Sequence, residues 1–288
     1  VTTSYGRVHC YDSAPDSHTS PALLVHGLGG SSLSLLPVAA RLVSRRRVLL
    51  VDMLHFSDLS EPLYDALTSS QHVRALLEVI AKCSPGPVDY VGHSVGGGAG
   101  IHLATRHGEY LRSLSLINPG GFRTGLDRVM DDVFGIDAVR AAEVLERCVA
   151  VRPGLGGALT RRIGRRVLHE LLSGRAVRDY LRTIHDQDCV DGVLTKVKCP
   201  TLLLWGEEDG LLPKDIALAL TNHVADVEAY WVAGCSHLLP LEAPATVAST
   251  LARFWALPEE RPGLLERLLP PRAPRLTPIP RPRAAAPG

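Results

Sequence analysis

The sequence predicts an α/β fold whose mostly parallel central sheet is flanked by helices on both faces. Short apolar runs recur along the chain without polar alternation, which is typical of strands buried on both sides. Segments with helically spaced apolar residues separate these runs, so strands and helices alternate. One long interval, about residues 120–198, has almost no strand signal and predicts a helical insertion.

The individual elements follow from these patterns. Leu35, Leu36, Ala39 and Leu42 predict one helix face over about residues 32–44. A second helix is predicted over 69–82, and a third begins shortly after residue 94. Strands are predicted at 22–25, 48–51, 88–91, 114–117, 202–205 and 230–232.

The chain divides into a core, an insertion and a tail. Residues 1–119 and 199–257 carry the strand–helix alternation of the core. The insertion, 120–198, has an apolar residue every four positions, which predicts a helix: Leu155, Leu159, Ile163, Val167 and Leu171. The tail, 258–288, is rich in Pro and Arg. We expect a short helix at 264–269 and disorder from residue 270 onward.

Composition narrows the class of protein. The 288 residues carry a net charge of +1, which gives no general argument for binding nucleic acid or acidic membrane surfaces. No apolar run approaches the roughly 20 residues of a membrane span. The six cysteines are scattered without a CxxC pair, and the first residues lack the features of a signal peptide. We therefore expect a cytoplasmic protein with free thiols.

A serine among glycines follows the strand predicted at 88–91. The stretch VGHSVGGG, residues 91–98, contains Gly92-x-Ser94-x-Gly96, the pattern of a nucleophile elbow. In such a turn the strand passes directly into a helix, and the serine hydroxyl projects from the sheet. Glycines are needed because the strand and helix backbones approach closely. The pattern arises often by chance, and its place between a strand and a helix strengthens it.

A serine nucleophile needs a base, and the base needs an orienting carboxylate. Asp209 follows the strand at 202–205 in the stretch WGEEDG, and His237 follows the last strand in GCSH. The order Ser94, Asp209, His237 is the serine–acid–histidine order of α/β-hydrolases. Glu207 and Glu208 are alternative acids beside Asp209.

The reaction also needs donors for a developing oxyanion. The glycine-rich stretch HGLGG, residues 26–30, follows the first predicted strand. We expect the backbone N–H groups of Leu28 and Val95 to act as the donor pair, each worth roughly 3 kcal/mol in the transition state.

Together these pieces resemble the α/β-hydrolase family. The resemblance rests on four motifs that fall in order after predicted strands: HGLGG at 26–30, GHSVGG at 92–97, LLLWGEEDG at 202–210 and AGCSHLLPLEAP at 233–244. It implies that residues 120–198 form a helical cap over the active site. It also implies that Asn118, at a place where some relatives carry an acid, leaves Asp209 as the acid.

One loop departs from the resemblance. Many relatives carry glycines in a D-x-x-G-x-G-x-S loop, where this chain has Asp52 followed by His55 and Ser57. The resemblance therefore leaves the shape of the pocket near this loop open.

We interpret the chain as a cofactor-free serine hydrolase that cleaves an ester-like bond, in an ester, thioester or lactone, through an acyl-enzyme. The alternatives are a C–C bond hydrolase, an acyltransferase working with a carrier protein, and a non-catalytic binding protein of this fold. The expected partner is a small acyl substrate. No metal-ligand spacing supports a metal site at His185, Asp186, Asp188 and Cys189. The sequence predicts no particular oligomeric state.

Overall fold

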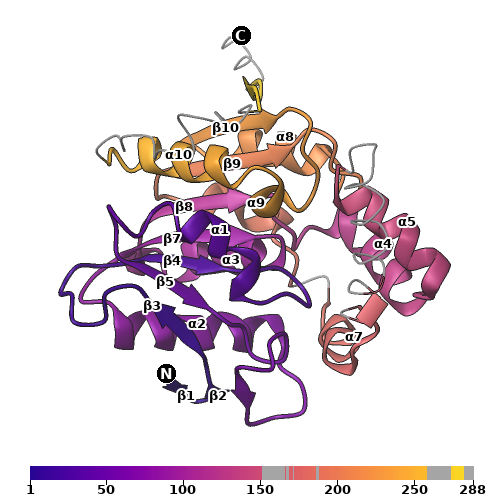
Figure 1. Ribbon diagram of the computed structural model, residues 1–288, viewed down its shortest axis with the longest axis horizontal. Helices are drawn as coiled ribbons and strands as arrows, with labels where there is room; N and C mark the ends of the chain where they lie inside the picture. The colour runs from indigo at the N-terminus through magenta and orange to yellow at the C-terminus, as the bar shows by residue number, and fades with distance from the viewer. Residues whose placement is uncertain (151–165, 167–168, 171, 186–187, 258–273, 282–288) are drawn as a thin grey trace, which may run out of the picture.

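A computed structural model describes residues 1–150, 166, 169–170, 172–185, 188–257 and 274–281. Its main sheet has eight strands in the order β11-β10-β9-β8-β7-β4-β5-β3. The six strands from β10 to β5 are parallel, and the two edge strands are antiparallel to their neighbours. The predicted mostly parallel sheet is therefore confirmed (Figure 1).

All six predicted strands are present, and most extend beyond their predicted ends. They are β4 (Ala22–Val25), β5 (Val48–Val51), β7 (Val88–His93), β8 (Leu111–Ile117), β9 (Thr201–Gly206) and β10 (Val227–Val232). The edge strand β3 (Cys10–Asp12) was not predicted. Three two-residue strands, β1 (Thr2–Thr3), β2 (Gly6–Arg7) and β6 (Glu61–Pro62), form a separate small sheet.

Helices cover both faces of the sheet, and β4 shows how the chain achieves this. Leu23 and Val25 belong to an apolar cluster with residues of α2 (Ser69–Cys83), α3 (Val95–Arg106) and α8 (Asp215–His223). Ala22 and Leu24 point the other way, into a cluster with residues of α1 (Leu36–Ala39) and α10 (Pro244–Phe254). Successive side chains of a strand point to opposite faces, so an unbroken apolar strand fills two cores.

The helix predicted over 32–44 is wrong in its extent. A 3-10 turn, η1 (Ser32–Ser34), is followed by the single-turn α1, and turns continue to residue 45. The apolar residues that suggested a long helix, Leu35 and Leu42, are buried all the same. Burial alone therefore produced the periodic pattern. The second helix is confirmed as α2, which begins with a capping box between Thr68 and Gln71.

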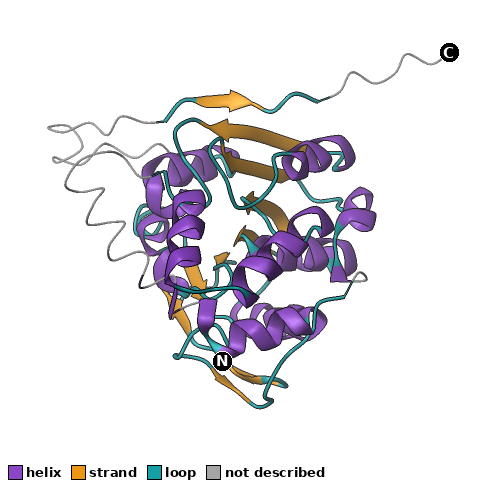
Figure 2. Ribbon diagram, turned by 90° about the vertical axis from the view of Figure 1, so that its right-hand side faces the viewer, coloured by secondary structure: helices purple, strands orange, loops and turns teal. Residues whose placement is uncertain are grey.

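The 120–198 segment lies between β8 and β9. It contains α4 (Arg123–Phe134), α5 (Ala138–Cys148), α7 (Arg175–Arg182) and the 3-10 helix η4 (Asp191–Lys196). Figure 1 places α4, α5 and α7 together at one end of the sheet, away from α1 and α10, and Figure 2 views the molecule from that side. The leucine stripe predicted from Leu155 to Leu171 lies outside the described residues, as does the helix predicted at 264–269.

The prediction of a disordered tail is wrong for residues 276–278. They form β11 (Leu276–Pro278), which pairs with the outer edge of β10. Proline cannot donate to a ladder, but an edge strand needs donors on one side only. Here the N–H groups of Ala233 and Ile279 bridge the strands, bonding Arg275 O at 3.0 Å and Ala229 O at 2.9 Å.

Candidate active site

Ser94 lies in a strained turn between β7 and α3. Its φ of 52° and ψ of −120° are unusual for a residue with a side chain, a conformation that costs about 1–3 kcal/mol. Backbone bonds hold it: Ser94 N donates to Ile117 O at 3.1 Å, and Gly97 N and Gly120 N both donate to Ser94 O at 2.8 Å. The strain is thus maintained by strands β7 and β8 and by the first turn of α3.

The glycines around Ser94 are needed for close packing, as predicted. A Cβ added to Gly92 would lie 2.3 Å from the carbonyl oxygen of Gly96. A Cβ added to Gly96 would lie 2.5 Å from the carbonyl oxygen of Val25 on the neighbouring strand. Moving these oxygens would shift the first turn of α3 or strand β4, so no larger residue fits at these two positions.

The structure brings Ser94, His237 and Asp209 into one hydrogen-bond chain. Ser94 Oγ and His237 Nε2 are 3.1 Å apart, and His237 Nδ1 and Asp209 Oδ2 are 2.8 Å apart. Because a carboxylate only accepts, Nδ1 carries a proton, and in the tautomer with the proton there Nε2 presents its lone pair to the serine hydroxyl. His237 and Asp209 are buried, and Ser94 is partly exposed.

Asp209 is surrounded by donors. Leu211 N and Leu212 N donate to Oδ1 at 2.9 and 3.0 Å, and the Asn118 side chain donates to Oδ2 at 2.6 Å. Burial alone would raise the pKa of Asp209, but the charge and hydrogen bond of His237, with these donors, outweigh burial and lower it. Asp209 is therefore ionised at neutral pH. Sequence reasoning used Asn118 only to exclude an acid there and missed its contact with Asp209.

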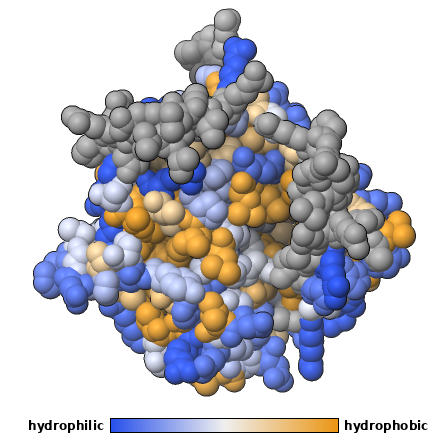
Figure 3. Space-filling model, in the orientation of Figure 1, coloured by the Kyte–Doolittle hydropathy of each residue, from blue (hydrophilic) through white to orange (hydrophobic). Residues whose placement is uncertain are grey.

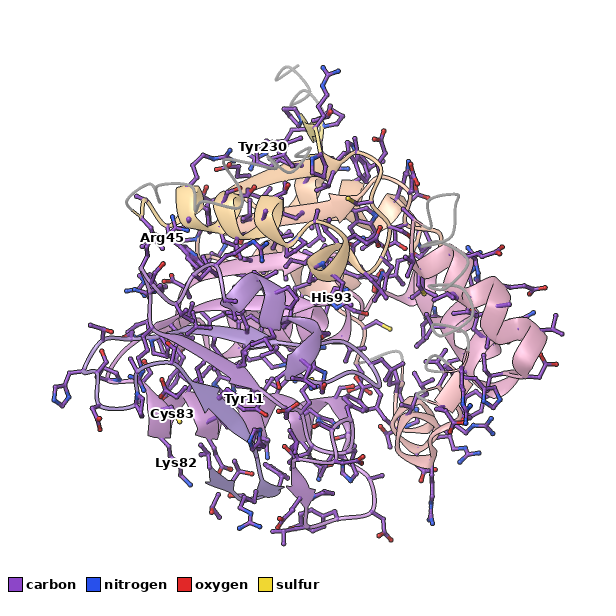
Figure 4. All side chains as sticks on the ribbon, in the orientation of Figure 1. Tyr11, Arg45, Lys82, Cys83, His93 and Tyr230 are labelled. Carbon is purple, nitrogen blue, oxygen red and sulfur yellow. The ribbon has the colours of Figure 1, made fainter. Side chains whose placement is uncertain are left out.

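His93 supports the loop that carries His237. Its Nε2 donates to the backbone carbonyl of His237 at 2.8 Å, a contact that sequence reasoning did not find. Burial, with His237 nearby, lowers the pKa of His93 to about 3, so its ring is neutral. Figure 4 shows His93 near the centre of the molecule, at the end of the sheet that faces α4, α5 and α7.

The loop predicted to supply an oxyanion donor passes directly against the serine. A Cβ added to Gly27 would lie 2.9 Å from Ser94 Cβ. His26 connects this loop to the residue after β5 and Asp52. Its Nδ1 donates to Gly27 O at 2.8 Å, and its Nε2 accepts from Met53 N at 3.0 Å. Leu28 and Val95 both line the cavity beside Ser94.

The loop with the unusual residues His55 and Ser57 has a structural role. His55 has a φ of 67°, the left-handed region that favours glycine, and its Nε2 donates to Tyr64 O at 2.8 Å. Neither His55 nor Ser57 is among the residues that line the cavity. Asp52, which precedes them, accepts from Ser32 N and Ser32 Oγ, both at 2.8 Å.

The end of α5 is bonded to the loops that carry Asp209 and His237. Arg147 O accepts from Gly210 N at 3.0 Å and from Ser236 Oγ at 2.7 Å. Glu242 adds a second link, since its Oε2 accepts from Ala150 N at 3.1 Å and from Ser236 N at 3.0 Å. The 120–198 segment is thus attached to both loops at once.

A cavity of about 160 Å³ is lined by Ser94 and by described residues of the 120–198 segment. Much of its lining is aliphatic or aromatic and comes from α2, α3 and the 120–198 segment: Val73, Ala99, Phe122, Leu126, Val129, Val133, Val144, Leu172, Leu181 and Ile184. Asp132 lines it too, but pairs with Arg147 at 2.7 Å and Arg140 at 3.2 Å. No lysine or arginine is among the described lining residues.

No metal site emerges within the residues that the structure describes, where no three His, Cys, Asp or Glu side chains cluster suitably. Asp188 instead accepts from His185 N at 2.9 Å, which closes a turn. In the described part of the chain, no helix is both long and apolar enough to cross a membrane. Apolar residues on the face shown in Figure 3 form separate groups interrupted by hydrophilic residues.

Comparison with known proteins places this arrangement in a family. Residues 22–250 match the sequence model of the family described as "Alpha/beta hydrolase family". The chain is 24% identical over 258 residues to a 2-hydroxymuconate semialdehyde hydrolase of Pseudomonas sp. (strain CF600), covering 82% of this chain and 87% of that one. It is 23% identical over 261 residues to the monoacylglycerol lipase ABHD6 of Bos taurus, covering 83% and 76%.

Solved structures agree on the fold. The naproxen esterase (carboxylesterase NP) of Bacillus subtilis superposes with a TM-score of 0.71 at 21% identity, covering 88% of this chain and 90% of that one. The family match spans well over half of the residues and includes the stretches that carry Ser94 and Asp209. The chain therefore belongs to the alpha/beta hydrolase family and is a hydrolase of that fold.

Proposed function

We propose that the protein is a cofactor-free serine hydrolase that cleaves carboxylic esters of apolar acyl groups through an acyl-enzyme. The observation that carries this proposal is the hydrogen-bond chain Ser94–His237–Asp209 at the mouth of an apolar cavity. A serine, a histidine and a carboxylate that are hydrogen-bonded in this order suit acyl transfer. The histidine acts as a base for the serine hydroxyl, and the carboxylate orients the histidine.

Acylation begins when Ser94 Oγ attacks the ester carbonyl carbon. His237 Nε2 takes the hydroxyl proton, and Asp209 stabilises the resulting imidazolium through Nδ1–H. The backbone N–H groups of Leu28 and Val95 receive the oxyanion, which the position of Gly27 against Ser94 favours. The tetrahedral intermediate collapses, the alcohol leaves with the proton from His237, and the acyl group remains on Ser94.

Deacylation repeats these steps with water. His237 Nε2 takes a proton from a water molecule as its oxygen attacks the acyl carbon. The acid leaves when Ser94 Oγ regains the proton from His237. Thioesters and lactones react by the same route.

The cavity lining favours a neutral substrate. Aliphatic side chains surround the space next to Ser94, and no cationic side chain lines it among the described residues. An anionic acyl group would lose its hydration there without gaining a partner. The names of the relatives point to two classes, a lipase and esterases on one side, and hydrolases of a semialdehyde and of a dienoic acid on the other.

A C–C bond hydrolase is the second candidate, favoured by the relatives whose names give a semialdehyde or a dienoic acid as substrate. An acidic substrate is disfavoured by the described lining, which includes Asp132 but no lysine or arginine. Acyl transfer to an alcohol, with a carrier protein as donor, uses the same residues and would be detected as transfer faster than hydrolysis. A non-catalytic binding role would need none of the three residues.

We also propose a cytoplasmic location. None of the six cysteines, all of which lie within the described residues, forms a disulfide, which fits a reducing compartment.

A substrate panel tests the proposal. We expect 4-nitrophenyl esters of straight-chain acids to be hydrolysed, and 2-hydroxy-6-oxo dienoic acids to be turned over at least about 100-fold less efficiently. Ser94→Ala, compared with Ser249→Ala on α10, should abolish ester turnover while the control retains it. Turnover of the dienoic acids alone would replace the proposal with C–C hydrolysis, and activity that persists in Ser94→Ala would exclude both.

A further inference from the structure

The last described strand, β11, covers the outer edge of β10 in the main sheet. It runs antiparallel to β10, and both views place it outside the parallel strands (Figure 1, Figure 2). Residues 258–273, which lie between α10 and β11 in the sequence, are outside the described part of the chain. Among the described residues, no strand pairs with the other side of β11, so this side of the sheet ends there.

The backbone of β11 has an inner and an outer side. Ile279 N donates to Ala229 O at 2.9 Å, which makes these two residues a hydrogen-bonded pair. Hydrogen-bonded and non-hydrogen-bonded pairs alternate along antiparallel strands. Thr277, two residues before Ile279 and opposite Trp231, therefore belongs to the next hydrogen-bonded pair. Its N–H points toward β10, and the N–H positions of the residues between point away.

Prolines occupy the outer side of this alternation. Pro278 lies between Thr277 and Ile279, where an N–H would point away from β10. Pro280 follows Ile279 by one residue and lies on the same side of the alternation. Because proline has no N–H, the outer edge of β11 lacks donors at both positions, while its inner edge keeps them. Proline on an exposed edge prevents a further strand from pairing there.

Side chains hold β11 against the sheet as well. Ile279 is 5% exposed and belongs to the apolar cluster on one face, whereas Leu276 packs against the cluster on the other. The Arg281 guanidinium donates to the backbone carbonyls of Ala225 at 3.2 Å and Val227 at 2.7 Å. The segment therefore extends both cores and satisfies carbonyls of the β10 edge that its own backbone does not reach.

The edge that β11 covers is complementary to itself. A two-fold axis sets two copies of one strand antiparallel, which is the orientation in which β10 accepts β11. With the axis at Ala229, Val227 of each copy lies opposite Trp231 of the other. Such β-branched and aromatic pairs stabilise antiparallel strands. Glu228 lies opposite Tyr230 in this register, so no like charges meet.

We propose that the edge of β10 is a pairing surface for a second copy of this chain, and that β11 occupies it and keeps the copies apart. An uncovered strand edge is a template for pairing, and the self-complementary edge of β10 makes a second copy the fitting partner. The outer prolines of β11 then leave a covered edge that accepts no further strand. No residue of β10 or β11 lines the cavity at Ser94, so the inference is independent of the proposed reaction.

Thr277→Pro in the full chain tests the proposal, because it removes an N–H that points to β10 and leaves β10 itself unchanged. Sedimentation equilibrium measures the mass of the particle in solution. We expect Thr277→Pro to have about twice the mass of wild type. Thr277→Ala is the matched control: the side chain is exposed and the N–H is kept, so the mass should equal that of wild type.

A peptide identifies the surface at which the copies meet. RLTPIPR, the sequence of residues 275–281, should bind the free edge of β10 when added in excess to Thr277→Pro. We expect it to return the mass to that of wild type. The peptide RLPPIPR, which carries the same substitution as the protein, should leave the mass unchanged. Hydrogen exchange at Ala233, whose N–H donates to Arg275 O, shows whether β11 is bound.

The outcomes decide the proposal. A mass increase that RLTPIPR reverses and RLPPIPR does not would support it. An increase that persists with RLTPIPR, or that Thr277→Ala reproduces, would place the contact elsewhere and overturn it. An unchanged mass with faster exchange at Ala233 would show a free edge that a second copy does not take. Unchanged mass and exchange, even after Ile279→Asp is added, would show that these contacts do not hold β11, which also overturns the proposal.

Discussion

The carboxyl ends of the parallel strands and the 120–198 segment meet at the same cavity but are built differently. At the strand ends, Ser94, His237 and Asp209 are held by hydrogen bonds to one another and to surrounding backbone. The segment contributes mainly aliphatic side chains to the cavity. Directional bonds fix atoms within tenths of an ångström, whereas apolar contacts tolerate changes of shape. In the proposed mechanism, the strand ends carry the reaction and the 120–198 segment influences which substrate is bound.

The two regions are joined at few points, which makes the comparison testable. In the described residues, the end of α5 bonds the loops of Asp209 and His237 through Arg147 O, Cys148 O and Glu242. Changes at the strand ends should therefore reduce kcat for every substrate. Changes in the segment should alter KM or substrate preference and leave the chemical step intact.

Replacing the proposed base gives the largest effect. His237→Gln removes the group that accepts the Ser94 proton, and we expect kcat to fall by about 10⁵-fold for all esters. Stopped assays with 4-nitrophenyl esters measure the loss, and His223→Gln is the matched control. A fall in activity for some chain lengths only would contradict the assignment of chemistry to the strand ends.

Replacing the proposed acid should cost about 10³- to 10⁴-fold in kcat, because Asp209→Asn no longer holds His237 in the required tautomer. Glu208→Gln, one residue earlier and exposed, should leave kcat within about 2-fold. The pair also decides between the neighbouring acids of the stretch WGEEDG. Equal losses in both variants would reject Asp209 as the orienting carboxylate.

The close packing behind Ser94 predicts a stability effect. Gly96→Ala places a Cβ within 2.5 Å of Val25 O, and we expect the free energy of unfolding to fall by about 3 kcal/mol. Gly108→Ala is the control, since an added Cβ there meets nothing within 4 Å. Urea unfolding measures both variants. If the two lost the same stability, the crowding at the elbow would not be the cause.

The link through Glu242 predicts a small effect that depends on pH. Burial raises the pKa of Glu242, so folding favours its protonated form, and wild-type stability declines as pH rises from the ordinary value of Glu through the raised one. Gln keeps an acceptor oxygen and does not titrate. Glu242→Gln should therefore gain stability over wild type as pH rises, on the order of 1 kcal/mol by about pH 8.

Urea titrations between about pH 4 and pH 8 measure this gain, with the exposed Glu143→Gln as control. The expectation fails if the difference in stability between Glu242→Gln and wild type stays constant over this range. It fails also if Glu143→Gln shows the same change with pH. Either result would show that the buried charge of Glu242 does not lower the stability of the folded protein.

Predictions from the sequence were most accurate where a local residue pattern alone determines the structure. Val48–Val51 was predicted with its correct ends, and the glycines around Ser94 were explained by the packing that the structure shows. The helix over 32–44 and the disordered tail failed because periodicity and composition do not report tertiary contacts. Leu276–Pro278 is a strand only because the edge of β10 is available to it.

Contacts between distant residues were beyond the sequence for the same reason. The bonds from Asn118 to Asp209 and from His93 to the carbonyl of His237 join residues far apart in the chain. The same is true of the cavity, whose lining joins residues of α2, α3 and α7. Motifs indicated which side chains carry the proposed reaction, while the supporting contacts and the substrate pocket required the three-dimensional structure.

The central claim is that Ser94 is an activated nucleophile, and covalent labelling with a fluorophosphonate tests it most directly. Intact-protein mass spectrometry should detect one phosphonyl adduct, which peptide mapping places on Ser94. Ser94→Ala should remain unlabelled, and His237→Gln should be labelled far more slowly. A folded wild-type protein that stays unlabelled while binding methyl octanoate, or an adduct that persists in Ser94→Ala, would contradict the account.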